Sequence, residues 1–238
     1  MAIREVAYNS LTYSISYEII NKDNKDTIVF LHGWGSNKEI MKQAFGKDLE
    51  RFRLIFLDLP GFGSSSIHVP IKTDDYKNIV NLFLNSLNVE NFTIVGHSFG
   101  GKIGAMLNPK NLILLSSAGI LVKKSFKIKM KIRIFKIFKN IVPKSFYKFF
   151  ASNDVNGMNQ TMYEVLKSVV DEDFRNIFKN ITSKTLIFWG KDDSATPLDS
   201  GKEIANIIEK SRFYALEGDH FFFIKNNKFI AKVIDEHL

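Results

Sequence analysis

The stretch Gly96-His97-Ser98-Phe99-Gly100-Gly101 constrains this chain most, because it joins an apolar run (92–95) to a segment of helical composition (102–107). A Gly-x-Ser-x-Gly sequence between a strand and a helix is typical of a sharp turn, since the two glycines leave room for the backbone to reverse. Ser98 then lies at a helix start, where free N–H groups and the helix dipole favour developing negative charge. The stretch predicts a nucleophilic serine.

This pattern is weak when taken alone. Its three fixed positions recur by chance in roughly one chain of this length in ten, given ordinary Gly and Ser usage. A glycine-rich turn with an incidental serine is the alternative, and the rest of the chain has to decide between the two.

The composition indicates one well-packed domain with an insertion. The chain has 238 residues, 45% of them hydrophobic, which is ample for a single core. It has no cysteine, which excludes disulfides, a thiolate metal site and a cysteine nucleophile. We expect neither a metal nor a cofactor. The first residues lack the apolar segment of a signal peptide, and no apolar run approaches the roughly 18 residues of a spanning helix, so we expect a soluble cytoplasmic protein.

Strands and helices alternate along the chain. A hairpin turning at Asn9-Ser10 is followed by strands over 27–31, 53–57, 92–95, 112–115, 185–189 and 212–216. Helices are predicted over 74–87, with Thr73 as its cap, and over 199–209 and 222–237. This order predicts an α/β fold, in which a mostly parallel twisted sheet carries helices on both faces.

The polar residues that follow the predicted strands fall at one edge of such a sheet. They are His32-Gly33-Trp34, Ser98, Asp193 and His220. Open α/β sheets bind ligands beyond the carboxyl ends of their strands. The chain order of nucleophile, acid and histidine is that of α/β-hydrolases and differs from the orders in chymotrypsin and subtilisin.

From about Thr27 to its end, the chain therefore resembles the α/β-hydrolase superfamily. The resemblance implies that Ser98 is the nucleophile, His220 the general base and acid, and Asp193 the carboxylate that orients His220. It also implies that the backbone N–H groups of Trp34 and Phe99 form the oxyanion hole. Asp192 is adjacent to Asp193; we prefer Asp193, three residues after a glycine, as in the family pattern. Only 14 residues separate Ser98 from the next strand, which is short for the superfamily.

An insertion from Ala118 to about Thr182 lies where the superfamily has its cap or lid. Residues 126–134 alternate apolar and basic residues, as in a strand, whereas 134–141 have helical spacing. We interpret the segment 123–140 as a helix, so the predicted fold includes a helical cap.

The positive charge of the chain is concentrated in and before this insertion. No acidic residue occurs between Glu90 and Asp154, and 12 of the 33 Lys and Arg fall there, which leaves 21 basic residues against 25 acidic ones elsewhere. A solvated face is one explanation. A seat for an acidic carrier protein and attachment to an anionic membrane surface are the others, whereas nucleic acid is disfavoured because no binding motif accompanies the charge. The residues proposed for the seat are Lys123, Lys124, Lys127, Lys131 and Arg133.

The serine in the turn argues against dehalogenases and epoxide hydrolases of this fold, which use aspartate there. The motifs 32–35 and 58–63 look like those of pimeloyl-acyl-carrier-protein methyl ester esterases, so the first prediction is hydrolysis of a carboxylic ester through an acyl-serine intermediate. The second is a meta-cleavage product hydrolase, which cleaves a carbon-carbon bond. That subgroup usually carries a tryptophan in the loop after the histidine, whereas Phe221 follows His220 here. A non-catalytic binding protein is the third and weakest alternative.

Overall fold

The computed structural model describes residues 1–121 and 159–238. Within these ranges it forms one eight-stranded sheet in the order β1-β2-β4-β3-β5-β6-β7-β8. β2 is antiparallel to β1 and to β4, and the other neighbouring pairs are parallel, which confirms the predicted mostly parallel sheet. The strands are β1 (Ala2–Tyr8), β2 (Leu11–Ile20), β3 (Thr27–Leu31), β4 (Arg53–Leu57), β5 (Thr93–His97), β6 (Asn111–Leu115), β7 (Lys184–Gly190) and β8 (Ser211–Leu216).

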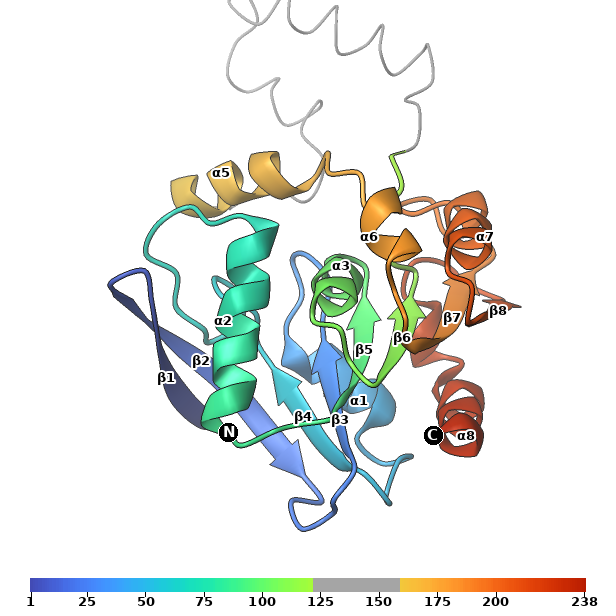
Figure 1. Cartoon of the computed structure of the whole chain (residues 1–238), viewed down its shortest axis with the longest axis horizontal. Coiled ribbons are helices and arrows are strands. Elements are labelled where there is room, and N and C mark those ends of the chain that lie inside the picture. The colour runs from blue at the N-terminus through green and yellow to red at the C-terminus, as the bar shows by residue number, and fades with distance from the viewer. Residues whose placement is uncertain (122–158) are drawn as a thin grey trace, which may run out of the picture.

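Helices cover both faces of the sheet (Figure 1). One face carries α1 (Lys38–Phe45) and α8 (Asn227–His237), and the other carries α2 (Thr73–Ser86), α3 (Phe99–Met106) and α7 (Leu198–Ile207). α3 is short, as expected from the 14 residues between Ser98 and the next strand. The hairpin turn is as predicted, since Asn9 and Ser10 have φ values of 48° and 63°, which suit a tight two-residue turn.

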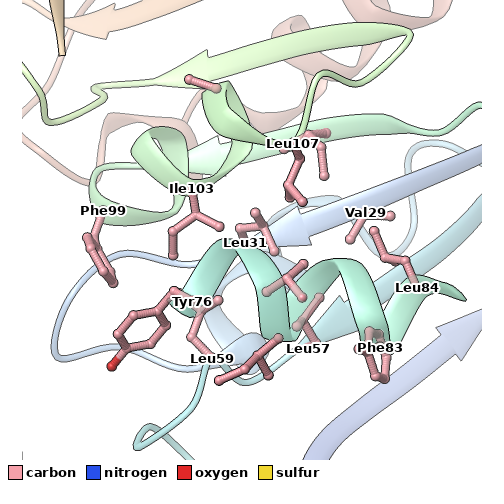
Figure 2. Close-up of a cluster of buried hydrophobic side chains, with 14 of the residues drawn as sticks. Val29, Leu31, Leu57, Leu59, Tyr76, Phe83, Leu84, Phe99, Ile103 and Leu107 are labelled. Carbon is pink, nitrogen blue, oxygen red and sulfur yellow. The ribbon is translucent and has the colours of Figure 1, made fainter. Parts of the chain in front are cut away.

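The apolar runs form central strands because they bury both of their faces. In β3, Val29 and Leu31 pack in the core cluster under α2 and α3, whereas Ile28 and Phe30 pack in the cluster under α1 and α8. Figure 2 shows Val29 and Leu31 beside Ile103 on the first of these faces. Each fully buried side chain of this size contributes about 1.5–3 kcal/mol to folding. An interruption of the run by a charged residue would therefore be strongly destabilising.

The strand register brings the carboxyl ends of the parallel strands to one edge. Leu31 is paired with Leu57 and with Gly96, and His97 is paired with Leu115. Helix α5 (Gln160–Val169) lies across this edge, and α6 (Arg175–Lys179) follows it (Figure 1). The loops that follow β3, β5, β7 and β8 therefore meet beneath α5.

The two described ends of the predicted cap, residues 118–121 and 159–182, contain α5 and α6. The predicted helix over 123–140 and the basic residues Lys123, Lys124, Lys127, Lys131 and Arg133 lie outside the described residues. A cap with bounds at 118 and 182 stays a prediction.

Three local predictions were wrong or incomplete. Thr73 is not the cap of α2: Lys72 has the extended backbone of a cap, and the Thr73 hydroxyl instead donates to Glu172 at 2.5 Å. The helix predicted over 222–237 is divided into a 3-10 turn (Phe222–Ile224) and α8, because the Asn226 side chain hydrogen-bonds the carbonyl groups of Glu217 and Phe222. Helix α1 was not predicted, although its cap Asn37, which accepts from the N–H of Glu39 at 3.0 Å, is a recognisable start signal.

Candidate active site

Ser98 occupies a strained turn between β5 and α3. Its backbone has φ 50° and ψ −111°, a conformation that a residue with a side chain adopts only under constraint. Two glycines permit the turn, because a Cβ at Gly96 would lie 2.6 Å from the carbonyl oxygen of Gly100, and one at Gly100 would lie 2.3 Å from that of Leu31. The Ser98 N–H donates to Leu115 O at 3.1 Å, which ties the turn to β6. The sharp turn expected from the sequence is present.

His220 and Asp193 are joined by a hydrogen bond. Nδ1 of His220 lies 2.8 Å from Oδ2 of Asp193, although the two residues follow different strands, β8 and β7. Asp193 is buried, whereas its neighbour Asp192 is exposed. Of the two adjacent carboxylates, the structure therefore places Asp193 against His220.

The environment of Asp193 keeps it ionised. Burial alone would raise the pKa of its carboxyl, but the hydrogen bonds from His220 and Thr196 and the charge of His220 together lower that pKa to about 2. Its Oδ1 atom accepts from the N–H groups of Ala195 and Thr196, both at 2.9 Å. An ionised Asp193 holds a proton on Nδ1 of His220 and leaves Nε2 of that ring free to accept one.

Thr196 is a residue of this network that the sequence reasoning missed. Its hydroxyl lies 2.8 Å from Oδ2 of Asp193 and 3.4 Å from Nδ1 of His220. An aspartate followed three residues later by threonine is a common local turn in which the carboxylate accepts from the following N–H groups. That spacing was the signal available in the sequence.

The loop after β3 passes directly against Ser98. A Cβ at Gly33 would lie 3.1 Å from Cβ of Ser98, so a glycine is required at that point. Burial lowers the pKa of His32 to about 4, so its ring is neutral at pH 7. Nε2 accepts from the Leu59 N–H at 3.0 Å, so the ring proton is on Nδ1, which donates to Gly33 O at 2.8 Å. His32 thereby holds the Gly33-Trp34 peptide in place beside Ser98.

Ser98, His220, Trp34 and Phe99 line one pocket of about 440 Å³. Thr196 also lines it, whereas Asp193 lies behind His220. A larger hollow of about 610 Å³, next to α6, contains none of the predicted site residues. Apolar side chains form much of the remaining wall of the first pocket: Ile120, Leu121, Leu166, Val169, Val170 and Phe221.

The wall of this pocket also contains a buried ion pair. Nζ of Lys102, one turn along α3 from Ser98, lies 2.5 Å from Oε2 of Glu172 and 2.6 Å from Val169 O. Lys102 is 2% exposed, and its ammonium group also lies 4.5 Å from the centre of the Phe174 ring. Its positive charge is thus already compensated. The sequence reasoning did not identify this pair, because its partners are 70 residues apart.

Residues 26–161 match the alpha/beta hydrolase fold family, so the chain belongs to this family. It is 26% identical over 230 residues to the biotin biosynthesis bifunctional protein BioHC of Teredinibacter turnerae, with 77% of this chain and 39% of that protein covered. It is 39% identical over 97 residues to the pimeloyl-[acyl-carrier protein] methyl ester esterase of Pseudoalteromonas atlantica, with 38% of this chain and 36% of that protein covered. Both alignments span less than half of the relative.

The esterase EaEST from Exiguobacterium antarcticum has the same fold, with a TM-score of 0.77, 21% identity and 98% of each chain covered. These comparisons place the chain in the α/β hydrolase enzyme family, with esterases among its relatives. None of the helices in residues 1–121 and 159–238 has the length and apolar character needed to cross a membrane.

Proposed function

We propose that this protein hydrolyses carboxylic esters through an acyl-serine intermediate on Ser98. The observation that carries the proposal is the 2.8 Å hydrogen bond between His220 and Asp193 at the wall of the pocket that Ser98 also lines. A serine in a strained strand-to-helix turn, a histidine and an ionised carboxylate are together the groups that acyl transfer needs.

In the acylation step, Oγ of Ser98 attacks the ester carbonyl carbon while Nε2 of His220 takes the hydroxyl proton. The negative charge that forms on the carbonyl oxygen is accepted by the N–H groups of Trp34 and Phe99, the second of which lies at the N-terminus of α3. The tetrahedral intermediate then expels the alcohol, which takes the proton from His220. Asp193 stabilises the imidazolium ion that exists between these two transfers.

In the deacylation step, water replaces the alcohol. His220 takes a proton from the water as its oxygen attacks the acyl carbon, and it returns a proton to Oγ of Ser98 as the carboxylic acid leaves. The same N–H groups stabilise the second oxyanion. The enzyme is regenerated without a cofactor in this scheme.

The pocket wall favours an apolar acyl group without a charge. Its aliphatic side chains gain contact with a hydrocarbon chain, and Lys102 is not available to a substrate carboxylate while Glu172 holds it. The alternative reaction, cleavage of a 2-hydroxy-6-oxo-dienoate, needs a cation for that carboxylate. Of the arginines in the insertion, Arg175 is bound to Asp173 and Glu203 at 2.6 Å each and does not line the pocket, and Arg133 lies outside the described residues. These observations favour the ester reaction.

An acyl group delivered by an acidic carrier protein is a narrower form of the same proposal. It is supported by the relative whose name specifies a pimeloyl-[acyl-carrier protein] methyl ester and by the run of basic residues from Lys123 to Arg133 in the sequence. Positive charge near the pocket would raise the association rate of such a partner.

The test is the loss of turnover in Ser98→Ala, measured with p-nitrophenyl esters of increasing chain length. We expect a decrease in kcat of about 10⁶ with an unchanged fold, because the nucleophile is lost while the pocket remains. Ser86→Ala, an exposed serine on α2, is the matched control. A fluorophosphonate should label Ser98 in the wild-type protein. Normal turnover in a folded Ser98→Ala variant contradicts the proposal.

A further inference from the structure

His97 is the residue between β5 and the strained turn, and the ester mechanism above does not use its side chain. The ring is 1% exposed, and its Nε2 atom lies 3.0 Å from the carbonyl oxygen of His220, 123 residues away in the chain. A buried histidine that contacts the main chain of the proposed acid-base residue, directly beside the proposed nucleophile, calls for an explanation.

The protonation state of His97 follows from its surroundings. Burial, reinforced by the charge of His220, lowers the pKa of His97 to about 3, so the ring is neutral at pH 7 and carries one proton. A carbonyl oxygen only accepts hydrogen bonds, so this proton is on Nε2 and is donated to His220 O. Nδ1 is then an acceptor, and it is buried without a hydrogen-bond partner in the part of the chain that the structure describes.

The His97 ring is wedged among three loops. A Cβ at Gly33 would lie 2.8 Å from Nδ1, so the loop after β3 packs tightly on one edge of the ring. The ring centre lies 4.6 Å from that of His220, and 4.8 Å from that of Phe223. The loops after β3, β5 and β8 carry Trp34, Ser98 and His220 respectively, and each of them touches or includes His97.

The hydrogen bond from Asp193 restrains the His220 ring at Nδ1 but does not place the His220 backbone relative to Ser98. The bond from His97 does, because it joins the residue before Ser98 to the peptide of His220. We propose that His97 is a positioning residue, which sets the distance between His220 and Ser98 through its Nε2–H bond to the His220 carbonyl. This inference rests on the ester function proposed above.

Two substitutions separate the hydrogen bond from the packing. His97→Phe keeps a ring in the cavity but removes the donor. His97→Gln keeps a donor, because a glutamine amide nitrogen reaches about as far from Cα as Nε2 of histidine does. We expect kcat to fall about 10- to 100-fold in His97→Phe with KM changed less than about two-fold, since small displacements of reacting groups cost this much. His97→Gln should recover most of the loss.

The matched control is His68→Phe. His68 also has Nε2 near a main-chain carbonyl, that of Thr12 at 2.9 Å, but it lies on the surface between β2 and the segment before α2. We expect wild-type kcat and KM for this variant. If His97→Phe does not fold, His97→Asn replaces it, because the shorter amide does not reach His220 O. Equal activity of the Gln and Asn variants, or full activity of His97→Phe, overturns the proposal.

A measurement without substrate keeps this proposal distinct from the ester function. Nitrogen-15 NMR of the resting protein should show His97 as the neutral Nε2–H form at pH 7, and the His220 ring resonances should shift in His97→Phe but not in His68→Phe. Ester turnover that is absent from the wild-type protein refutes the ester function and leaves this measurement valid. An Nδ1–H form of His97, or unchanged His220 resonances in His97→Phe, refutes the positioning role.

Discussion

Thr196 and His220 bind the same oxygen of the Asp193 carboxylate. The Thr196 hydroxyl and Nδ1 of the His220 ring each lie 2.8 Å from Oδ2, while Oδ1 is occupied by two backbone N–H groups. The carboxylate is thus held from both sides, and its orientation toward His220 is determined by local bonds within the turn that follows β7.

Replacement of Thr196 by Val should lower ester turnover without unfolding the protein. The change keeps the shape of the side chain but removes a hydrogen bond to a charged acceptor, which contributes about 1.5–3 kcal/mol. We expect kcat to decrease by roughly 10-fold, and KM to change little, as measured by steady-state kinetics. The control is Thr12→Val at an exposed position of β2. A Thr196→Val enzyme with wild-type kcat would show that Asp193 needs no support from the hydroxyl.

The adjacent carboxylates should differ strongly in their importance. Asp193→Asn removes the charge that holds the His220 tautomer, and we expect it to lower kcat by about 10⁴. Asp192→Asn, which alters an exposed side chain, should lower kcat less than about three-fold. Kinetics of the two purified variants decide the matter, and the reverse ranking would transfer the role to Asp192.

The two candidate reactions predict opposite substrate preferences. Because Lys102 is paired with Glu172, we expect high kcat/KM for simple neutral esters and low kcat/KM for 2-hydroxy-6-oxo-dienoates, which carry a carboxylate. Both values are measured spectrophotometrically with one enzyme preparation. A higher kcat/KM for the dienoate would favour the carbon-carbon bond hydrolase.

Stability should decrease in mild acid because of His32 and His97. Burial lowers their pKa values to about 4 and about 3, whereas a histidine in an unfolded chain titrates near about 6.5. Between about pH 6.5 and 4 the unfolded state therefore binds protons that the folded state does not. The free energy of unfolding is fully present above this window and falls within it by about 1 kcal/mol per pH unit for each histidine.

Urea unfolding at pH 7.5, 6 and 5 measures this slope. His97→Gln removes one of the two titrating rings, so its free energy of unfolding should depend less steeply on pH than that of the wild-type protein, by about one proton. Equal slopes for the two proteins would show that His97 is not held neutral by the fold.

A carrier-bound ester should respond to salt differently from a small one. Steering by Lys127, Lys131 and Arg133 is screened over roughly 10 Å at 0.1 M salt, so kcat/KM for the carrier-bound ester should fall with added salt while that for a small neutral ester stays constant. Reversal of these three residues to Glu should cause the same selective loss. An equal response of both substrates argues against the carrier, and binding of the protein to anionic but not neutral vesicles would favour the membrane alternative.

The sequence by itself determined the order of the elements and the positions of the polar residues at the strand ends. The runs 27–31 and 53–57 are buried on both faces, and the turn around Ser98 has its glycines where the backbone must reverse. These features are local, because the conformation of a short segment depends on residues a few positions apart. Helix α1 and the break before α8 were missed because their signals are single polar side chains.

Only the tertiary structure decided which distant residues meet. It placed Asp193 rather than Asp192 against His220, brought Glu172 to Lys102, and joined His97 to the carbonyl of a residue 123 positions away. The sheet register and the path of each loop set these contacts, and neighbouring residues in a turn point to opposite sides for reasons that composition does not record. The residue types of the site could therefore be read in the chain, whereas their partners depended on how the strands align.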